Sequence, residues 1–534
     1  MFHPKRLPAL TRSLACACAL CGVIALTGCA PQSDQPTTLD LKQGRSAAAS
    51  NTQTLQAAVN AASYSGGGTI YLPAGTYYFD WGHQDDAGNC AIIMRDNVTI
   101  VGAGMDETFL KPLGIYEETG EAEHGIDMFA YDGVRSDTYL VNADFSDFTI
   151  DGSATQGSPT GYNALGKGFF FTLFKDCDWN RVKVMYTDGT GFGADFPVNC
   201  TMTDCIAVQC GKNTDAEGTG ASGFGVGTGY SEDESMTIEN CSSTDNMKYG
   251  FFFEHQTVFD NPHAKAQSAQ GFVVRNCSAS GNLYNFGCNR GNDVRFIDCT
   301  SDVSSDASRE SYTRSAFQFH NYSARISVEG GSISQTYADI DPDDACYEAV
   351  RWALARNIAE VGSDGYNTFR PDDKTTRGEF AVFLWRYAGR PGNVVLGSRA
   401  SLVNPTSDVQ FDSYYGEAVR WLKEDDLSIA DPFRPEDPMT YREIVTVLWR
   451  YRHLLENPQS EAANAASSAS GTPAKRENAV ETATRATRSD SEAAVAWAVE
   501  NGILPMDESS PKLDESCPRE ALIQMLRTFD DLCD

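Results

Sequence analysis

The sequence is poor in basic residues, with 42 Lys and Arg against 73 Asp and Glu and a formal net charge of −31. An acidic surface of this kind repels polyanions, which argues against nucleic acid and anionic membrane surfaces as partners. A polyanionic glycan would need a cation or a local basic patch between itself and the protein. We therefore expect no nucleic-acid partner.

Apolar runs long enough to cross a membrane are also missing. The run at residues 14–26 follows Lys5, Arg6 and Arg12 and falls short of the about 20 residues that a bilayer requires. It predicts an export signal. The run ends in Leu26-Thr27-Gly28-Cys29, which resembles the lipobox of bacterial lipoproteins. The resemblance implies a signal peptide at residues 1–29, lipidation of Cys29 and a polar tether at residues 30–51, so that the protein contacts the membrane only through its lipid anchor.

Cysteine spacings typical of metal sites are absent after Cys29, where no Cys-x-x-Cys pair occurs. Sixteen cysteines in an exported chain would suggest disulfides. Five of them, however, end the same apolar-x-(Asp/Asn)-Cys pattern, which favours stacked and buried thiols. These five are Cys177, Cys205, Cys241, Cys277 and Cys299. Cys200, Cys205 and Cys210 remain candidates for pairing.

Helical periodicity is missing between residues 191 and 321, where short alternating segments recur instead. A phenylalanine stands at the same place in five of them, at intervals of roughly 30 residues, which is typical of a solenoid. The five are Phe192, Phe224, Phe251, Phe286 and Phe317. Stacked coils bury such a column together. The predicted fold class is therefore mainly β, a right-handed parallel β-helix.

Residues 52–102 form the start of this β-helix. Leu55, Val59 and Ala62 lie on one face of a short helix, and Gly68-Thr69-Ile70-Tyr71-Leu72-Pro73-Ala74-Gly75-Thr76-Tyr77 follows. This order resembles the entry to pectate-lyase-like β-helices, in which a helix covers the open end of the coils. The resemblance extends over residues 52–334 and implies a polysaccharide ligand.

From residue 341 the sequence becomes helical and aromatic. A Glu-Ala-Val-Arg-Trp pattern begins two repeats at Glu348 and Glu417, and a related pattern begins a third at Ala493. The second helices open with capping boxes at Thr376 and Thr440. These repeats resemble S-layer homology repeats, at about 341–392, 408–455 and 490–534, with a disordered linker at 456–489.

The S-layer resemblance implies a small all-α domain that binds a cell-wall secondary polymer, and hence a protein at the cell surface, lipid-anchored, wall-associated or both. The candidate glycan-binding residues are Arg377, Glu379, Arg442 and Arg519. Only Arg377 matches the position of the arginine in the family's Thr-Arg-Ala-Glu motif. Arg442 and Arg519 are displaced by one residue.

Chemistry is expected on the outward-facing columns of the β-helix, where small residues form a floor beside polar ones. The candidate catalytic residues are Asp188, Asp195, Glu254, His255, Arg290 and His320. The candidate substrate-binding residues are Tyr249, Phe252, Asn289 and Gln318. An extended polysaccharide suits such a face, because the coil spacing repeats along its length.

Hydrolysis is the first mechanism that this column favours. Asp195 and Glu254 stand two coils apart, roughly 9–10 Å between backbones, and inverting glycosidases hold their carboxyl groups about 6.5–9.5 Å apart. The alternative is a uronate polysaccharide lyase or C5-epimerase. Its base would be one of Arg290, His255, His320 and Lys248, and Ca²⁺ could be held by Asp188, Asp195 and Glu254.

Family motifs leave these mechanisms open. The Asp-Asp pair and the Gly-His-Gly of polygalacturonases are missing between residues 140 and 333. Sites resembling those of alginate epimerases read Tyr-Gly-Phe-Asp-Pro-His, whereas here Tyr249-Gly250-Phe251 continues as Phe252-Phe253-Glu254-His255. A third alternative is a non-catalytic glycan-binding protein or adhesin, for which Phe196 and Phe252 would supply stacking surfaces.

Overall fold

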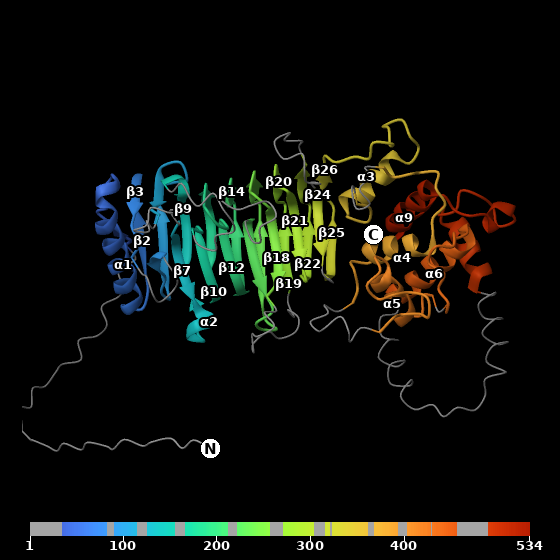
Figure 1. Cartoon of the computed structure of the whole chain (residues 1–534), viewed down its shortest axis with the longest axis horizontal. Helices are drawn as coiled ribbons and strands as arrows, with labels where there is room; N and C mark the ends of the chain where they lie inside the picture. Colours follow the sequence, from blue (N-terminus) through green and yellow to red (C-terminus); the bar gives the residue numbers. More distant parts are fainter. Residues whose placement is uncertain are drawn as a thin grey trace, which may run out of the picture. The chain divides into compact units, whose positions relative to one another are not determined.

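The computed structural model describes residues 35–533 except 83–89, 115–124, 155–165, 212–221, 257–270, 304–314, 321–322, 361–367, 393–402, 429 and 457–489. Cys29 and the signal peptide predicted at residues 1–29 lie outside the described residues. Figure 1 shows the strands side by side in chain order, beginning beside the blue helix α1 (Ala48–Tyr64). Two sheets contain these strands, and every described pairing within them is parallel, as a β-helix requires.

The smaller sheet has nine strands and carries the outward columns described above. They are β4 (Cys90–Ile93), β7 (Asp127–Asp132), β8 (Leu140–Val141), β10 (Phe169–Lys175), β12 (Phe192–Val198), β15 (Ser222–Thr228), β18 (Tyr249–His255), β21 (Tyr284–Asn289) and β24 (Ser315–His320).

The larger sheet has seventeen strands and forms the remaining walls. They are β1 (Thr37–Thr38), β2 (Gly68–Leu72), β3 (Gly75–Phe79), β5 (Val98–Gly102), β6 (Thr108–Pro112), β9 (Asp144–Asp151), β11 (Asp178–Met185), β13 (Cys200–Thr203), β14 (Ile206–Val208), β16 (Ser235–Glu239), β17 (Ser242–Thr244), β19 (Gly271–Arg275), β20 (Ser278–Ser280), β22 (Asn292–Ile297), β23 (Thr300–Asp302), β25 (Ala324–Glu329) and β26 (Ser332–Ile333).

The predicted phenylalanine column is a buried ladder of stacked rings. Phe192 pairs with Phe224, and Phe224 with Phe251, with ring centroids 4.6 and 4.7 Å apart. The ladder continues through Phe286 to Phe317 at 5.3 and 5.5 Å. Ring spacing close to the strand spacing of about 4.8 Å lets each coil bury its ring against the next. The parallel β-helix prediction is confirmed.

The recurring Asp or Asn before cysteine occupies a corner of each coil. At Asp204, Asn240 and Asn276 the backbone is left-handed, with φ of 54°, 55° and 51°, a conformation that Asn and Asp tolerate best among residues with a side chain. The cysteine that follows is buried. The Cys205 backbone NH donates to the Cys241 Sγ at 3.3 Å. Every described cysteine is a free thiol, Cys200, Cys205 and Cys210 included.

The prediction of a tether at residues 30–51 is wrong for its second half. Thr37 and Thr38 pair with β2, Leu39 and Leu41 are buried, and α1 begins at Ala48. Two leucines in a polar stretch are enough to anchor it, because each gains stability from burial. The folded region therefore begins before residue 52.

Helix α1 covers the first coils through both apolar and polar contacts. Leu55 and Val59 are fully buried. Gln56 donates to the Ile93 carbonyl at 3.0 Å and accepts from the Ile93 NH at 2.8 Å. The amide side chain thus pairs with backbone at the exposed edge of β4, which would otherwise need another strand.

The C-terminal part consists of three helix–loop–helix repeats, as predicted. The helices are α3 (Tyr347–Ala355), α4 (Arg377–Tyr387), α5 (Gly416–Glu424), α6 (Tyr441–Glu456), residues 490–500 and α9 (Arg519–Cys533). Shorter helices are α2 (Gly133–Ser136), η1 (Arg45–Ala47), η2 (Gly152–Ala154) and η5 (Pro511–Asp514). The linker predicted at 456–489 lies, after Glu456, outside the described residues.

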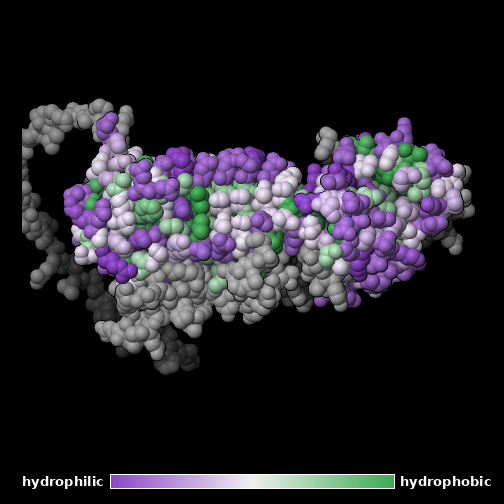
Figure 2. Space-filling model, turned by 90° about the horizontal axis from the view of Figure 1, so that it is seen from above, coloured by the Kyte–Doolittle hydropathy of each residue, from purple (hydrophilic) through white to green (hydrophobic). Residues whose placement is uncertain are grey.

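A ring of backbone hydrogen bonds joins the three repeats just before their second helices. The Thr375 NH donates to Cys517, the Cys517 NH to Met439, and the Met439 NH to Thr375, at 2.8–2.9 Å. The repeats are thereby related by an approximate threefold arrangement. No helix within the described ranges is long and apolar enough to cross a membrane. On the face that Figure 2 shows, hydrophobic residues gather in small patches among hydrophilic ones.

Candidate functional site

A hollow lies on the outer face of the nine-stranded sheet, between β10 and β18. Its floor is made of small residues from β12 and β15, and its charged residues come from three different coils. The lining residues are Lys167, Thr190, Gly193, Asp195, Ser222, Gly225, Val226, Gly227, Phe252, Glu254 and Gln256. Two of the predicted catalytic residues, Asp195 and Glu254, therefore line one hollow, together with the predicted substrate-binding residue Phe252.

Glycine at position 227 lets the two carboxylates face each other. Asp195 pairs with Gly227, and Gly227 with Glu254, across adjacent strands. A Cβ added to Gly227 would lie only 2.3 Å from Asp195 Oδ1 and 2.7 Å from Gln256 Nε2. The Asp195 side chain thus leans over the glycine, toward the strand of Glu254. A larger residue at position 227 would displace it.

Burial sets the electrostatics of both carboxylates. It raises the pKa of Asp195 to about 6, and the charge of Glu254 adds to that rise while Lys167 opposes it. Burial also raises the pKa of Glu254, against a hydrogen bond from Asn289 and the nearby charges of Lys248 and Arg290. The Asn289 amide donates to Glu254 Oε1 at 2.5 Å. Carboxyl groups with raised pKa values can give or take a proton near neutral pH.

Lys167 brings a cation into this acidic protein. Its Nζ lies 4.3 Å from the centroid of the Phe170 ring. A Cβ added to Gly193 would lie 3.3 Å from Lys167 Cδ, so the lysine stem runs along the glycine toward Asp195. Lys167 is the local basic group that an acidic glycan would need, and the sequence pattern did not single it out, because it precedes the first aligned segment.

Tyr249 of β18 and His320 of β24 form a pair, and neither residue lines the hollow. The Tyr249 hydroxyl and His320 Nε2 are 2.8 Å apart, and Gln318 Nε2 lies 3.3 Å from the other ring nitrogen. Burial lowers the pKa of His320, and Lys248 lowers it further. Burial also raises the pKa of Tyr249. At neutral pH the pair is therefore an uncharged imidazole bonded to a phenol.

The structure places four predicted catalytic residues outside the lining of the hollow: His320, described above, and Asp188, His255 and Arg290. Asp188 is buried beside Gly125 and Gly166, where an added Cβ would meet its side chain. His255 is buried against Gly229. Arg290 lies at the end of β21, where its NH donates to the His320 carbonyl at 3.1 Å, and its charge opposes the rise in the pKa of Glu254.

The expected calcium ligands Asp188, Asp195 and Glu254 do not form one site. Asp188 does not line the hollow that contains the other two. Among the residues described, no three His, Cys, Asp or Glu side chains are placed to hold a metal ion. The donor set does not fit Ca²⁺, which takes six to eight oxygen ligands, so no reaction step is assigned to a metal.

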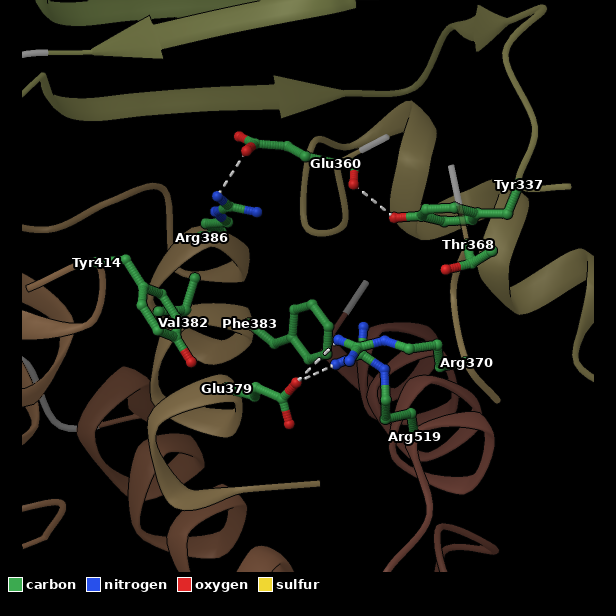
Figure 3. Close-up of a pocket in the computed structure, with 10 residues that line it drawn as sticks. All are labelled: Tyr337, Glu360, Thr368, Arg370, Glu379, Val382, Phe383, Arg386, Tyr414 and Arg519. Carbon is green, nitrogen blue, oxygen red and sulfur yellow. Dashed lines mark hydrogen bonds and ion pairs between the residues drawn. The ribbon is translucent and has the colours of Figure 1, made fainter. Parts of the chain in front are cut away.

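A second cavity of about 400 Å³ lies among the C-terminal repeats (Figure 3). Its lining combines three arginines with aromatic and acidic side chains. The lining residues are Tyr337, Glu360, Thr368, Arg370, Glu379, Val382, Phe383, Arg386, Tyr414 and Arg519. Two of the predicted glycan-binding residues, Glu379 and Arg519, are among them.

The predicted arginines mainly join one repeat to the next. Arg519 donates to Glu379 at 2.6 Å and to the Phe369 carbonyl. Arg377 makes the same two kinds of contact, with Glu443 at 3.0 Å and the Phe433 carbonyl. A third pair, Arg442 with Asp514 at 2.7 Å, joins repeats two and three.

Arg377 and Arg442 do not line the cavity, whereas Arg370 and Arg386 do. Sequence reasoning missed the latter two because it followed the helix-start motif. Arg386 pairs with Glu360 at 2.8 Å, and the Arg370 side chain is 49% exposed. Arg370 is therefore the arginine of this cavity that solvent and ligands reach most easily. The Phe369-Arg370-Pro371 loop, repeated as Phe433-Arg434-Pro435, was the available signal.

Two family models match the chain. Residues 46–257 match the model described as rhamnogalacturonase A/epimerase, pectate lyase-like, and residues 336–381 match the S-layer homology domain. Both resemblances expected from the sequence are confirmed; the first match covers the β-helix as far as β18, and the second covers most of the first helical repeat.

Curated relatives come from Azotobacter vinelandii. Alginate lyase 7 is 34% identical over 170 residues, which are 30% of this chain and 18% of that protein. Mannuronan C5-epimerase AlgE2 is 30% identical over 238 residues, 43% of this chain and 21% of that protein. The chain thus spans about a fifth of the length of these relatives. Among solved structures, the A-module of Azotobacter vinelandii mannuronan C-5 epimerase AlgE4 aligns with this chain at 21% identity and a TM-score of 0.34. The alignment covers 54% of this chain and 87% of the module.

Proposed function

We propose that this protein is a cell-surface enzyme of the lyase or C5-epimerase kind, acting on a uronate-containing polysaccharide in the hollow of the β-helix. The observation that carries the proposal is Lys167, which lies in one hollow with Asp195 and Glu254. Removing the C5 proton of a uronate requires both a base and a cation near the sugar carboxylate. The relatives named above support this chemistry better than glycoside hydrolysis, which the sequence placed first.

The lysine and the two carboxyl groups of the hollow have different roles in this reaction. Lys167 pairs with the sugar carboxylate and stabilises the negative charge that develops there. Asp195 and Glu254 transfer protons: one takes the C5 proton and the other, protonated, gives one. In elimination the proton goes to O4, the C4–O4 bond breaks and a C4–C5 double bond forms. In epimerisation a proton returns to C5 on the opposite face.

The test is incubation of the purified protein with mannuronate, guluronate and galacturonate polymers and with neutral glycans as controls. The ultraviolet absorbance of unsaturated uronates and the number of reducing ends are recorded together. Both signals are expected for a lyase, and neither for an epimerase, whose products differ in C5 configuration by nuclear magnetic resonance. Reducing ends without absorbance would mean hydrolysis and would contradict the proposal.

We also propose that the C-terminal repeats attach the protein to an acidic cell-wall polymer. The cavity in Figure 3, with Arg370, Arg386 and Arg519 in its lining, supports this proposal. Guanidinium groups bind carboxylates in a bidentate manner, and an acidic polymer would otherwise be repelled by a protein of net charge −31. Co-sedimentation of the protein with purified cell walls, at low and high salt, is the direct assay. Lipidation at Cys29 remains a separate proposal, testable by mass spectrometry of the mature N-terminus.

A further inference from the structure

The hollow is bounded at both ends along the axis of the β-helix. The register of the nine-stranded sheet places five residues in one outward column, one per coil. In chain order the column reads Phe170, Gly193, Gly225, Phe252 and Gly287. Only two glycines therefore separate two phenylalanines. A ligand lying along this column has a flat floor two coils wide.

The first wall is Lys167, which lines the hollow, with Phe170 behind it and outside the lining. The lysine Nζ lies 4.3 Å from the centroid of the phenylalanine ring. The cation is thus placed at one end of the glycine floor, and a carboxylate bound to it would belong to the sugar nearest this wall. At this end of the floor, Lys167 would bind a sugar carboxylate, and its side chain would obstruct the continuation of the glycan chain.

The second wall is Phe252 with Tyr249 stacked on it. Their ring centroids are 4.2 Å apart and their planes differ by 16°. The Tyr249 ring extends over the next coil, because a Cβ added to Gly287 would lie 2.2 Å from Tyr249 Cε1. The floor that Gly287 would offer is therefore occupied by the protein's own side chain.

Tyr249 is held firmly in this position. Only 2% of the residue is exposed, and its hydroxyl is 2.8 Å from His320 Nε2, two coils further along the sheet. Consistent with this, none of the residues that line the hollow comes from β21 or β24. Moving the ring aside would break that hydrogen bond and a stacking contact, each worth about 1 kcal/mol.

The dimensions limit what fits between the walls. Phe170 and Phe252 are three strand spacings apart, roughly 14 Å between backbones, and both rings occupy part of that length. The hollow between them is small, about 80 Å³, and the interior of a long chain would have to continue past Phe170 or Tyr249.

We infer that the hollow receives the terminal sugars of an acidic glycan chain rather than its interior, and that Tyr249 sets this limit. The inference rests on the proposed function for the class of sugar, since Lys167 is taken to bind a uronate. It adds the mode of action: an enzyme of this kind would work from chain ends. Short oligouronates would then bind as tightly as long polymers.

The test counts protein molecules bound per glycan chain, using size-fractionated oligo- and polymannuronate and the full-length protein with Asp195→Asn to prevent turnover. Light scattering or analytical ultracentrifugation gives the stoichiometry. At saturation we expect a number of proteins per chain that does not rise with chain length. A number that rises in proportion to length would overturn the inference, even if the wild-type protein turns the polymer over.

Variants at two tyrosines of the nine-stranded sheet make the test specific. Tyr249→Ser introduces the residue found at this position in β15 and β24, Ser222 and Ser315, and should open the floor at Gly287. The stoichiometry on long chains should then rise with length. Tyr131→Ser, on β7 and outside the lining of the hollow, is the control and should leave it unchanged. If Tyr249→Ser fails to fold, Tyr249→Phe, which removes only the bond to His320, should weaken the limit in part.

The outcomes separate the two proposals. Turnover of uronate polymers with many proteins bound along each chain would contradict the end-recognition inference alone. Absence of both binding and turnover with every uronate polymer would contradict the proposed function, and the inference with it. If the wild-type enzyme is a lyase, release of unsaturated ends with little early loss of viscosity is the kinetic result expected.

Discussion

At the scale of single residues, the hollow depends on burial acting on two carboxylates beside one lysine. Asp195 leans over Gly227, and Glu254 is hydrogen-bonded by Asn289. Because both side chains are partly buried, both carboxyl groups hold their protons more tightly than usual, and Lys167 partly offsets this for Asp195. A stable protein keeps such groups only at some cost in stability, which can be measured.

Asp195→Asn should stabilise the protein near neutral pH. The folded state holds the Asp195 proton with a pKa of about 6 against an ordinary 3.8. The stability that the proton confers is therefore complete below about pH 3.8 and is lost as the pH rises through about 6. The variant should gain at most about 3 kcal/mol at pH 7 and little at pH 4. Urea unfolding of the β-helix at both pH values measures the difference.

The control for this measurement is Asp302→Asn, which changes an exposed aspartate of β23. It should shift unfolding by the same small amount at both pH values. Equal stability of Asp195→Asn and wild type at pH 7 and pH 4 would contradict the burial of this carboxyl group.

Lys167→Met should reduce turnover of a uronate polymer by roughly 10²-fold or more, because it removes the only cation that lines the hollow as described. Lys175→Met, an exposed lysine on β10, should keep wild-type activity. Initial rates at saturating polymer would compare the two. Full activity of Lys167→Met would show that Lys167 has no role in the reaction.

At the scale of elements, each coil is stabilised by what its neighbours supply, and α1 does this for the first coil. Gln56 takes the place of a strand by bonding both backbone groups of Ile93. In the interior, each phenylalanine of the ladder stacks on the phenylalanine of the neighbouring coil. The coils are thereby fixed in register, which brings Lys167, Asp195 and Glu254 together from three separate coils.

Gln56→Ala should therefore destabilise the β-helix by about 1–3 kcal/mol, because it leaves a buried NH and a buried carbonyl unpaired. Gln53→Ala, on the exposed face of the same helix, should change stability by less than about 0.5 kcal/mol. Chemical denaturation followed by circular dichroism would resolve the two. Equal effects would mean that Gln56 does not serve the sheet edge.

The elements themselves were largely predictable from sequence, because phenylalanine, cysteine and Asp or Asn columns repeat with the coil. The site was predictable only in part. Asp195 and Glu254 follow from the column that contains them. Lys167 does not, since it lies before the first aligned segment, and neither does the burial of Asp188 and His255, which depends on the segments that pack beside them. The Leu39 and Leu41 contacts were hidden by the polar composition around them.

At the scale of the whole molecule, this acidic protein has basic residues in both of its candidate binding sites. One is Lys167 in the β-helix, and the other is the group of arginines in the cavity of the C-terminal repeats. A net charge of −31 makes both more important, because an acidic glycan is repelled elsewhere. The two places would let one protein hold the wall with one part and process a glycan with another.

Arg370→Gln should weaken binding to purified cell walls by roughly tenfold, as expected for losing one charge-assisted contact. Arg434→Gln is a matched control. Both arginines have a φ of 57° and face an aspartate three residues on at 3.7 Å, but Arg434 does not line the cavity. Co-sedimentation should be unchanged for Arg434→Gln. Equal losses in the two variants would point to general charge rather than to this cavity.

In the proposed reaction, a carboxylate in the hollow, that of Asp195 or Glu254, removes the C5 proton of a uronate. The most direct test is to incubate polymannuronate with the protein in D₂O and follow the C5 position by nuclear magnetic resonance, with Lys167→Met and Lys175→Met in parallel. We predict deuterium at C5 or a C4–C5 double bond for the wild type and Lys175→Met, and neither for Lys167→Met. Chain cleavage by wild type with every C5 proton retained and no double bond would contradict the claim and return the site to hydrolysis by Asp195 and Glu254.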